Sequence, residues 1–301
     1  MALTKRILNV VIALDSGDVT LDASLDMHVH VSKDALGMQQ TCTIDVFGLS
    51  QTLRQTLLSQ FTAWNKRQIE HPVGAVAPRN NYVPVKVYAG YQGESVGPTV
   101  PEQNTTTLIF DGWVVLCDPI SGPPNIGVRL TCYQLAQQKT QFISDVAPTS
   151  ATVEQYANWI AKQIGLARVL CVTSQKDKVI TNPSATTEVV AALLIDIQTY
   201  FRPNIAAFID NNTLIVKDQN QIIDSFNTVN VDEFVGTPMW TDWGVEFTCL
   251  YDQRIQLAGA ATLKSLMNPG LNRSWVITAL RYDLASRAEP FYVTVDGCPP
   301  A

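Results

Sequence analysis

Residues 25–32, which read Leu-Asp-Met-His-Val-His-Val-Ser, alternate without a break between apolar and polar side chains. Because successive side chains of a strand point to opposite faces, this period of two predicts a strand with one buried and one solvated face. The same alternation recurs in the first half of the chain at residues 41–47, 83–88, 106–116 and 127–133. A helix that Ser50 can cap interrupts these strands and places Leu57 and Phe61 on its apolar face. Residues 1–145 are therefore predicted to form a small, largely antiparallel barrel or sandwich with one inserted helix.

The period changes after residue 145. Thr152-Val153-Glu154-Gln155 is a capping box, in which the side chains of Thr152 and Gln155 satisfy backbone donors at the start of a helix, and Gly165 can close that helix. A second helix over residues 187–201 is predicted to stop at Arg202-Pro203, because proline cannot donate the next hydrogen bond. A hairpin follows with Asn211-Asn212 at its turn, where asparagine tolerates a positive φ. Residues 146–235 are thus predicted to be an α+β middle region.

Alternation returns in the last part of the chain, at residues 244–251, 260–265, 275–282 and 291–295. This pattern predicts a second small β-barrel over residues 236–301, which ends in a turn-rich tail. The expected fold class is α+β and mainly β, with two small β-barrel modules that flank the middle region.

Composition limits the classes of function. Apolar residues make up 46% of the 301 residues, which excludes wholesale disorder. The 21 Lys and Arg and 27 Asp and Glu give a net charge of −6 without a basic run, so nothing marks a surface for binding nucleic acid or an anionic membrane. Charged residues are only 16%, which favours a surface partly covered by other protein chains.

Membrane insertion is not expected, since no stretch approaches the ~18 consecutive apolar residues that span a bilayer. Lys5-Arg6 and the apolar run after them imitate a signal peptide, but Asn9 interrupts the run and no cleavage pattern follows, so a first strand is predicted instead. The six cysteines are scattered without a Cys-x-x-Cys pair, which favours a reducing compartment.

The motifs that could carry catalysis are incomplete. Residues 93–97 match the Gly-x-Ser-x-Gly nucleophile elbow, yet prolines follow and all three histidines lie upstream, so a glycine-rich loop is the preferred interpretation. Asp26, His28 and His30 share one strand face and could hold a cation, but no fourth ligand is evident and a solvated strand face is the simpler alternative. Phosphate-binding loops are missing from the sequence. We expect no catalytic residue, no cofactor and no metal site, and hence no enzyme.

Several short motifs, taken in order, resemble those of bacteriophage tail baseplate hub proteins. They lie at residues 42–53, 87–91, 108–114, 152–166, 207–216 and 236–265. The motif residues are Gly48, Leu49, Ser50, Gly90, Tyr91, Gly112, Gly236, Pro238 and Gly259. One departure is Arg281-Tyr282-Asp283, where many members carry a histidine before the aspartate.

The resemblance implies a structural protein of the virion, made in the bacterial cytoplasm and located in the tail baseplate. Such hubs carry two tudor-like barrel modules in one chain and form a homotrimer, which presents six similar platforms to the sixfold tail tube and a threefold face to the central spike. The implied partners are the tail tube protein, the spike protein and other baseplate proteins, with DNA or a tape-measure protein passing through the lumen. The alternatives are a tube-initiating or distal tail ring and a tail-associated cell-wall hydrolase.

Within this interpretation, two long connections are expected to contact partners, at residues 62–82 and 91–105, because loops of that length are usually functional or disordered. The candidate contact residues are Arg79, Asn80, Tyr82, Glu94, Val96 and Glu102.

Overall fold

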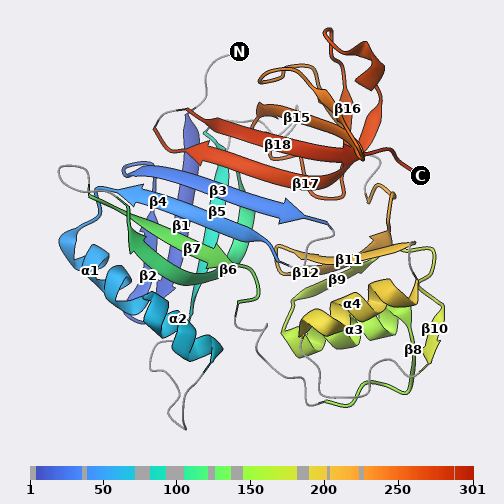
Figure 1. Ribbon diagram of the computed structural model, residues 1–301, viewed down its shortest axis with the longest axis horizontal. Helices are drawn as coiled ribbons and strands as arrows, with labels where there is room; N and C mark the ends of the chain where they lie inside the picture. The colour runs from blue at the N-terminus through green and yellow to red at the C-terminus, as the bar shows by residue number, and fades with distance from the viewer. Residues whose placement is uncertain are drawn as a thin grey trace.

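The computed structural model describes residues 5–35, 39–71, 82–92, 105–120, 126–136, 145–181, 190–201, 204–223, 227–287 and 289–301. The chain is 49% strand and 17% helix, so the expectation of a mainly β, α+β fold is confirmed. Thirteen strands form one large sheet, and a smaller layer of two helices over a short sheet packs at one side of it (Figure 1).

The thirteen strands begin and end close to the alternating segments of the sequence. They are β1 (Arg6–Leu14), β2 (Gly17–Leu21), β3 (Asp26–Asp34), β4 (Thr41–Phe47), β5 (Val83–Tyr91), β6 (Thr105–Pro119), β7 (Gly127–Tyr133), β13 (Val229–Val231), β14 (Met239–Thr241), β15 (Gly244–Leu250), β16 (Ala260–Leu263), β17 (Ser274–Ala285) and β18 (Phe291–Cys298). Their order is β14-β15-β18-β17-β3-β4-β7-β6-β5-β1-β2, with β13 and β16 attached beside β17. All neighbours are antiparallel except the pair β13 and β16, which is parallel.

The alternation predicts correctly which face of the sheet is buried. Met27, Val29 and Val31 of β3 are at most 2% exposed, whereas the side chains between them are half-buried or exposed. Burial of each such apolar side chain contributes about 1.5–3 kcal/mol to the stability of the folded chain. The apolar face of β3 therefore supplies most of the free energy that holds this strand in the sheet. All six cysteines are free, and Cys42 faces Cys132 across β4 and β7 in the core, where burial raises the pKa of Cys42.

Two five-stranded parts of the sheet repeat the same topology. We call β3, β4, β5, β6 and β7 the first unit and β14, β15, β16, β17 and β18 the second unit. Each is a hairpin followed by a three-stranded meander, and the second strand of the hairpin pairs with the last strand of the meander. The middle strand of each meander carries a register shift, between Val114 and Leu116 in β6 and between Ile277 and Ala279 in β17.

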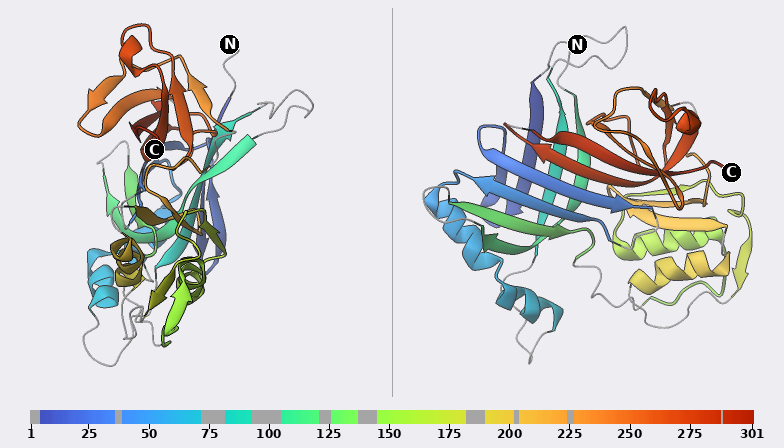
Figure 2. Two further views of the ribbon diagram at one scale, coloured as in Figure 1. Left: turned by 90° about the vertical axis from the view of Figure 1, so that its right-hand side faces the viewer. Right: turned by 45° about the horizontal axis from the view of Figure 1, so that its top comes forward.

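The two units join into one continuous sheet, because β3 at the edge of the first unit pairs with the second half of β17 (Figure 2). Among the described residues no ring of paired strands closes, since β14 and β2 stand at opposite ends of the sheet. The described strands therefore do not confirm the expectation of two small β-barrel modules. Alternation reports which face is buried, but the partner of an edge strand depends on contacts that are distant in sequence.

The middle region confirms the predicted local signals. Helices α3 (Val153–Ile164) and α4 (Val190–Tyr200) pack on a sheet in the order β11-β12-β9, and a short pair of strands, β8 and β10, lies beside them. Thr152 and Gln155 form the capping box, Gly165 has φ of 80°, and Asn211 and Asn212 have positive φ at the hairpin turn. The strands are β8 (Ser150–Thr152), β9 (Arg168–Cys171), β10 (Val179–Thr181), β11 (Ile205–Asp210) and β12 (Thr213–Asp218). The predicted stop at Arg202-Pro203 lies outside the described residues.

Two helices cover the first unit (Figure 1). Helix α1 (Gln51–Gln60) is capped by Ser50 as predicted, whose side chain accepts a hydrogen bond from the amide of Leu53. Helix α2 (Ala63–Glu70) follows at once with Thr62 as its cap, so the prediction that 62–82 is a plain connection is wrong over this part. None of the side chains of α2 is fully buried, which explains why its sequence lacks an apolar period. Within the described ranges, each helix is too short or too polar to reach across a lipid bilayer.

Candidate assembly surfaces

The exposed side of the sheet forms a continuous polar surface. We call it the polar face and define it as the solvated face of the eight neighbouring strands from β14 to the part of β6 that pairs with β7. Its ionisable residues are Asp26, Asp34, Asp45, Asp118, Glu246, Asp283, Asp296, Arg129, Arg281, His28 and His30. Seven carboxylates thus stand against two guanidinium groups, which gives this face a formal charge of −5 with neutral histidines.

Both arginines of the polar face are held by carboxylates from other strands of the same face. Nε and Nη2 of Arg129 each donate to one oxygen of Asp45 at 2.6 Å. Arg281 donates from Nη1 and Nη2 to the two oxygens of Asp296 at 2.7 and 2.9 Å, and from Nη2 to Glu246 at 2.7 Å. These hydrogen bonds raise the pKa of both guanidinium groups. The cations of the polar face are therefore already paired with anions of the same chain.

His28 and His30 lie on the polar face, in agreement with the interpretation of residues 25–32 as a strand with one solvated side. Nδ1 of His30 lies 3.1 Å from a carboxylate oxygen of Asp283 in β17, and Nε2 of His28 lies 4.0 Å from Asp26. Over the described part of the chain, no three side chains of His, Cys, Asp and Glu gather in an arrangement that could hold a metal ion.

An exposed apolar patch marks the end of the second unit. We call it the hairpin patch and define it as Met239, Trp240, Trp243, Leu266 and Met267, which are 56%, 53%, 86%, 97% and 82% exposed. The loop after β16 lies beside β14, because Nδ2 of Asn268 donates to the carbonyl of Pro238. The ring of Trp240 meets the ring of Trp275 edge to face at 5.7 Å. Met239 and Trp240 point to opposite faces of β14, since Met239 pairs with Glu246 and Trp240 pairs with Val245. Large exposed apolar side chains at this end of the sheet are a candidate contact surface.

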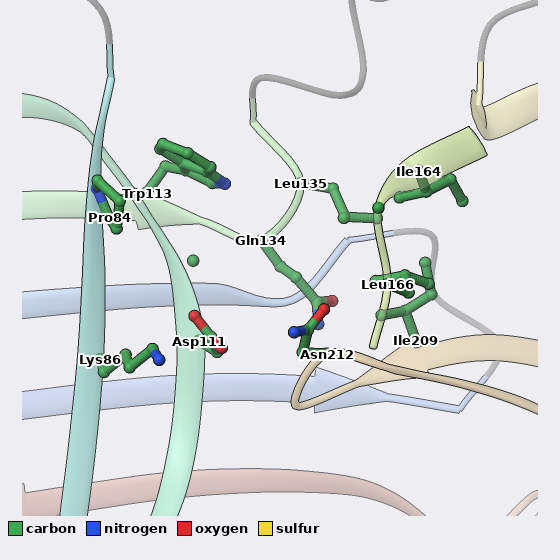
Figure 3. Close-up of a pocket in the computed structure, with 12 residues that line it drawn as sticks. Pro84, Lys86, Asp111, Trp113, Gln134, Leu135, Ile164, Leu166, Ile209 and Asn212 are labelled. Carbon is green, nitrogen blue, oxygen red and sulfur yellow. The ribbon is translucent and has the colours of Figure 1, made fainter. Parts of the chain in front are cut away.

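A cavity of about 270 Å³ lies where β5 and β6 meet the middle region (Figure 3). Lys86, Asp111, Trp113, Gln134 and Asn212 line its polar side. Burial raises the pKa of Asp111, and the Nε2 atom of the buried Gln134 makes no hydrogen bond among the described residues. The sequence did not indicate this cavity, because its walls come from segments that are far apart in the chain.

The motif residues lie at turns and close contacts. Gly48 and Gly236 have φ of 78° and 85°, which side chains other than glycine rarely adopt. A Cβ on Gly112 would come within 2.8 Å of the carbonyl of Tyr133. The remaining motif residues fill similar roles: Leu49 is buried, Ser50 caps α1, Gly90 and Tyr91 end β5, Pro238 accepts the hydrogen bond from Asn268, and Gly259 lies against the carbonyl of Gln256.

Of the six candidate contact residues, the structure describes one. Tyr82 is 4% exposed and packs with Val115, and its hydroxyl donates to Glu70 at 3.4 Å. Tyr82 is thus a buried residue of this chain and not part of an exposed loop. Arg79, Asn80, Glu94, Val96 and Glu102 lie outside the described residues, as does the Gly-x-Ser-x-Gly segment.

With this geometry in place, the chain can be compared with known proteins. The family model of baseplate hub gp41 matches residues 7–297. The chain belongs to the baseplate hub gp41 family. The resemblance inferred from the short motifs is confirmed, and the chain is a structural component of the phage tail baseplate.

Two crystal structures share the fold of this hub protein. A 43 kDa tail protein of prophage MuSo2 from Shewanella oneidensis is 9% identical with a TM-score of 0.59, and the match covers 97% of this chain and 98% of that one. A tail protein from Neisseria meningitidis MC58 is 10% identical with a TM-score of 0.58, and the match covers 96% of each chain. At these identities the likeness shows the fold alone. No curated protein matches the chain.

Proposed function

We propose that three copies of this hub protein form a ring that joins the sixfold tail tube to the threefold central spike. The observation that carries the proposal is the repeat of one five-stranded topology within a single chain. A trimer of such chains contains six units of similar topology, which is the number of similar platforms that a sixfold ring needs. A threefold spike contacts the same trimer through features that occur once in each chain, such as the α+β middle region.

The division of the chain into residues 1–145, 146–235 and 236–301 is part of this proposal. The first and last parts hold the two units, and residues 146–235 hold most of the second hydrophobic core, which includes Val153, Tyr156, Ile160 and Ile197. A separate core supports a separate role for the middle region. We infer that each unit is a tudor-like module, because the two units repeat one five-stranded topology.

The polar face fits the wall of a lumen through which a polyanion passes. Its seven carboxylates repel phosphate, and its two guanidinium groups are already paired with Asp45, Asp296 and Glu246. Both arginines of this face are therefore already paired when DNA passes. Non-specific attraction between the DNA phosphates and this face would be weak. The same face suits a tape-measure protein only if that protein avoids positively charged segments.

The proposed role requires no catalysis, and the tail tube, the spike and other baseplate proteins are the partners that it implies. The test is a reconstruction of the assembled tail by electron microscopy. We expect three copies around the tail axis, with both five-stranded units at the same radius and next to tube subunits. Six copies in one ring would refute the proposal and favour a tube-initiating or distal ring. Turnover of peptidoglycan by the purified chain would favour the hydrolase alternative.

A further inference from the structure

The cavity between the first unit and the middle region has a polar side and an apolar side (Figure 3). The polar side belongs to β5 and β6, where Lys86 lies opposite Asp111 in the strand register, so both side chains are on one face of the sheet. Lys86 and Asn212 are exposed, which leaves the cavity open to solvent. The apolar side belongs to the middle region and consists of Ile164, Leu166 and Ile209.

The two charged groups of the cavity have no partner within the described chain. Lys86 and Asp111 form no ion pair with each other or with any other described residue. Burial raises the pKa of Asp111, and the charge of Lys86 offsets part of this rise. A half-buried carboxylate that accepts no hydrogen bond from its own chain is free to accept one from a ligand.

Gln134 adds an amide without a partner beside these charges. Its side chain is 4% exposed, and its Nε2 atom makes no hydrogen bond to any residue that the structure describes. Figure 3 shows this side chain between the polar and the apolar side of the cavity. The indole nitrogen of Trp113, on the polar side, also lacks an acceptor among the described residues. Buried polar groups without partners are rare because they lower stability, so this arrangement points to a ligand.

The two charges select the class of ligand. Because Lys86 and Asp111 cancel, a simple anion or a simple cation would be attracted by one of them and repelled by the other. A ligand with a positive group next to a negative or carbonyl group satisfies both. Gly165, which closes α3, also lines the cavity, and the C-terminal end of a helix favours a positive charge. An α-amino group beside a carboxylate or carbonyl group has this chemistry.

We propose that the cavity binds the α-amino end of an amino acid with an apolar side chain, either free or as the first residue of a peptide. Asp111 binds the ammonium group, and the carboxylate or carbonyl oxygen accepts hydrogen bonds from Lys86 and Gln134. The apolar side chain packs against the apolar side of the cavity. The volume of about 270 Å³ is close to the lower end of the usual range for small-molecule sites, which suits a ligand of this size. The inference goes beyond the proposed ring and does not depend on it.

Calorimetric titration of the purified full chain with three probes tests the ligand class. L-leucine carries both charges, L-leucinamide keeps the ammonium group but has a neutral carbonyl, and N-acetyl-L-leucine has no ammonium group. We expect saturable binding of leucine and leucinamide and none of N-acetyl-leucine. Tighter binding of leucine would identify a free amino acid as the ligand, and tighter binding of leucinamide would identify the start of a peptide chain.

Matched variants test the residues. Asp111→Asn should weaken the binding of leucine at least about tenfold, because a charge-assisted hydrogen bond is lost. Asp118→Asn changes an exposed carboxylate of the same strand on the polar face and should leave the affinity unchanged. Lys86→Met alters an exposed position and should weaken leucine more than leucinamide, because only leucine offers a carboxylate.

Gln134→Met separates a binding role from a structural one. The variant replaces an amide that has no partner in the described chain by an apolar side chain of similar length, so the Tm of the free protein should not fall while the affinity for leucine does. A lower Tm with unchanged affinity would overturn the assigned role of Gln134.

Three results would overturn the site as a whole. The first is no saturable binding of leucine or leucinamide up to about 10 mM, an affinity that even an inefficient ligand of this size reaches. The second is equal binding of N-acetyl-leucine, and the third is an equal loss of affinity in Asp118→Asn. Each of them would leave the proposed ring untouched, because the copy number in the tail is measured separately.

Discussion

The ion pair between Lys33 and Asp210 tests how the middle region is attached to the sheet. Nζ of Lys33 in β3 donates to Asp210 at 2.6 Å and to Oδ1 of Asn211 at 3.1 Å, at the tip of the hairpin of β11 and β12. Lys33 is 3% exposed and Asp210 is 15% exposed. Water can therefore replace a lost partner of Asp210 more easily than a lost partner of Lys33. Substitution of Lys33 and substitution of Asp210 should lower the unfolding free energy by different amounts.

Asp210→Ala leaves the ammonium group of Lys33 buried with a single neutral acceptor. Removal of one partner from a buried ion pair costs about 3–5 kcal/mol, and the low exposure of Lys33 places this variant in that range. Lys33→Met leaves a carboxylate that water can reach and that keeps a hydrogen bond from Gln40 at 3.2 Å. Loss of one hydrogen-bond partner from such an acceptor lowers the unfolding free energy by about 1–3 kcal/mol. The double variant should resemble Lys33→Met, because it leaves no charge buried.

The assay is unfolding in urea, followed by circular dichroism and by tryptophan fluorescence, for the wild type, both single variants and the double variant. We expect the unfolding free energy to fall most for Asp210→Ala and the cost of the double variant to be clearly smaller than the sum of the single costs. Equal costs for the two single variants, or additive costs, would refute the reasoning that burial of Lys33 makes the pair asymmetric.

Three further outcomes follow from local features. Gly244→Ala should lower the unfolding free energy measured in urea by more than about 3 kcal/mol, because the φ of Gly244 is 153° and a Cβ would lie 2.1 Å from the carbonyl oxygen of Gly297. A loss below about 1 kcal/mol would contradict this reasoning. Burial lowers the pKa of Lys217 to about 8, so between pH 8 and the usual lysine pKa of about 10.4 the unfolded state binds more protons than the folded state. The unfolding free energy of the wild type should therefore rise over that pH window relative to that of Lys217→Met. A difference between the two proteins that stays constant with pH would contradict the lowered pKa. The double variant Asp34→Lys with Asp283→Lys changes the charge of the polar face from −5 to −1. The assembled ring of this variant should retain double-stranded DNA on filters in a salt-dependent way. The control variant Asp15→Lys with Asp18→Lys, which lies outside this face, should not retain DNA.

The sequence predicted elements well where the signal is local. The alternating segments 41–47 and 127–133 coincide with β4 and β7, and the capping box and the Asn211-Asn212 turn appear as expected. Each of these features depends on neighbours within a few residues. The same holds for His28 and His30, whose place on a solvated face follows from the period of two.

Other elements lacked such a signal. Strand β14 has three exposed residues in succession, so its sequence contains no alternation to detect. The pairing of β3 with β17 joins residues that are about 250 positions apart, and no local pattern specifies it. The charge of the polar face could be stated only after the strand registers placed seven carboxylates and two arginines on one side.

The continuity of the sheet has a mechanical consequence. Seven successive residue pairs between β3 and β17 tie the two units together across their backbones. Force applied to one unit along the strand direction loads this ladder in shear, so the neighbouring bonds share the load instead of breaking one after another. A hub built in this way would resist shear between its two five-stranded units, because the paired backbones of β3 and β17 hold them in one continuous sheet.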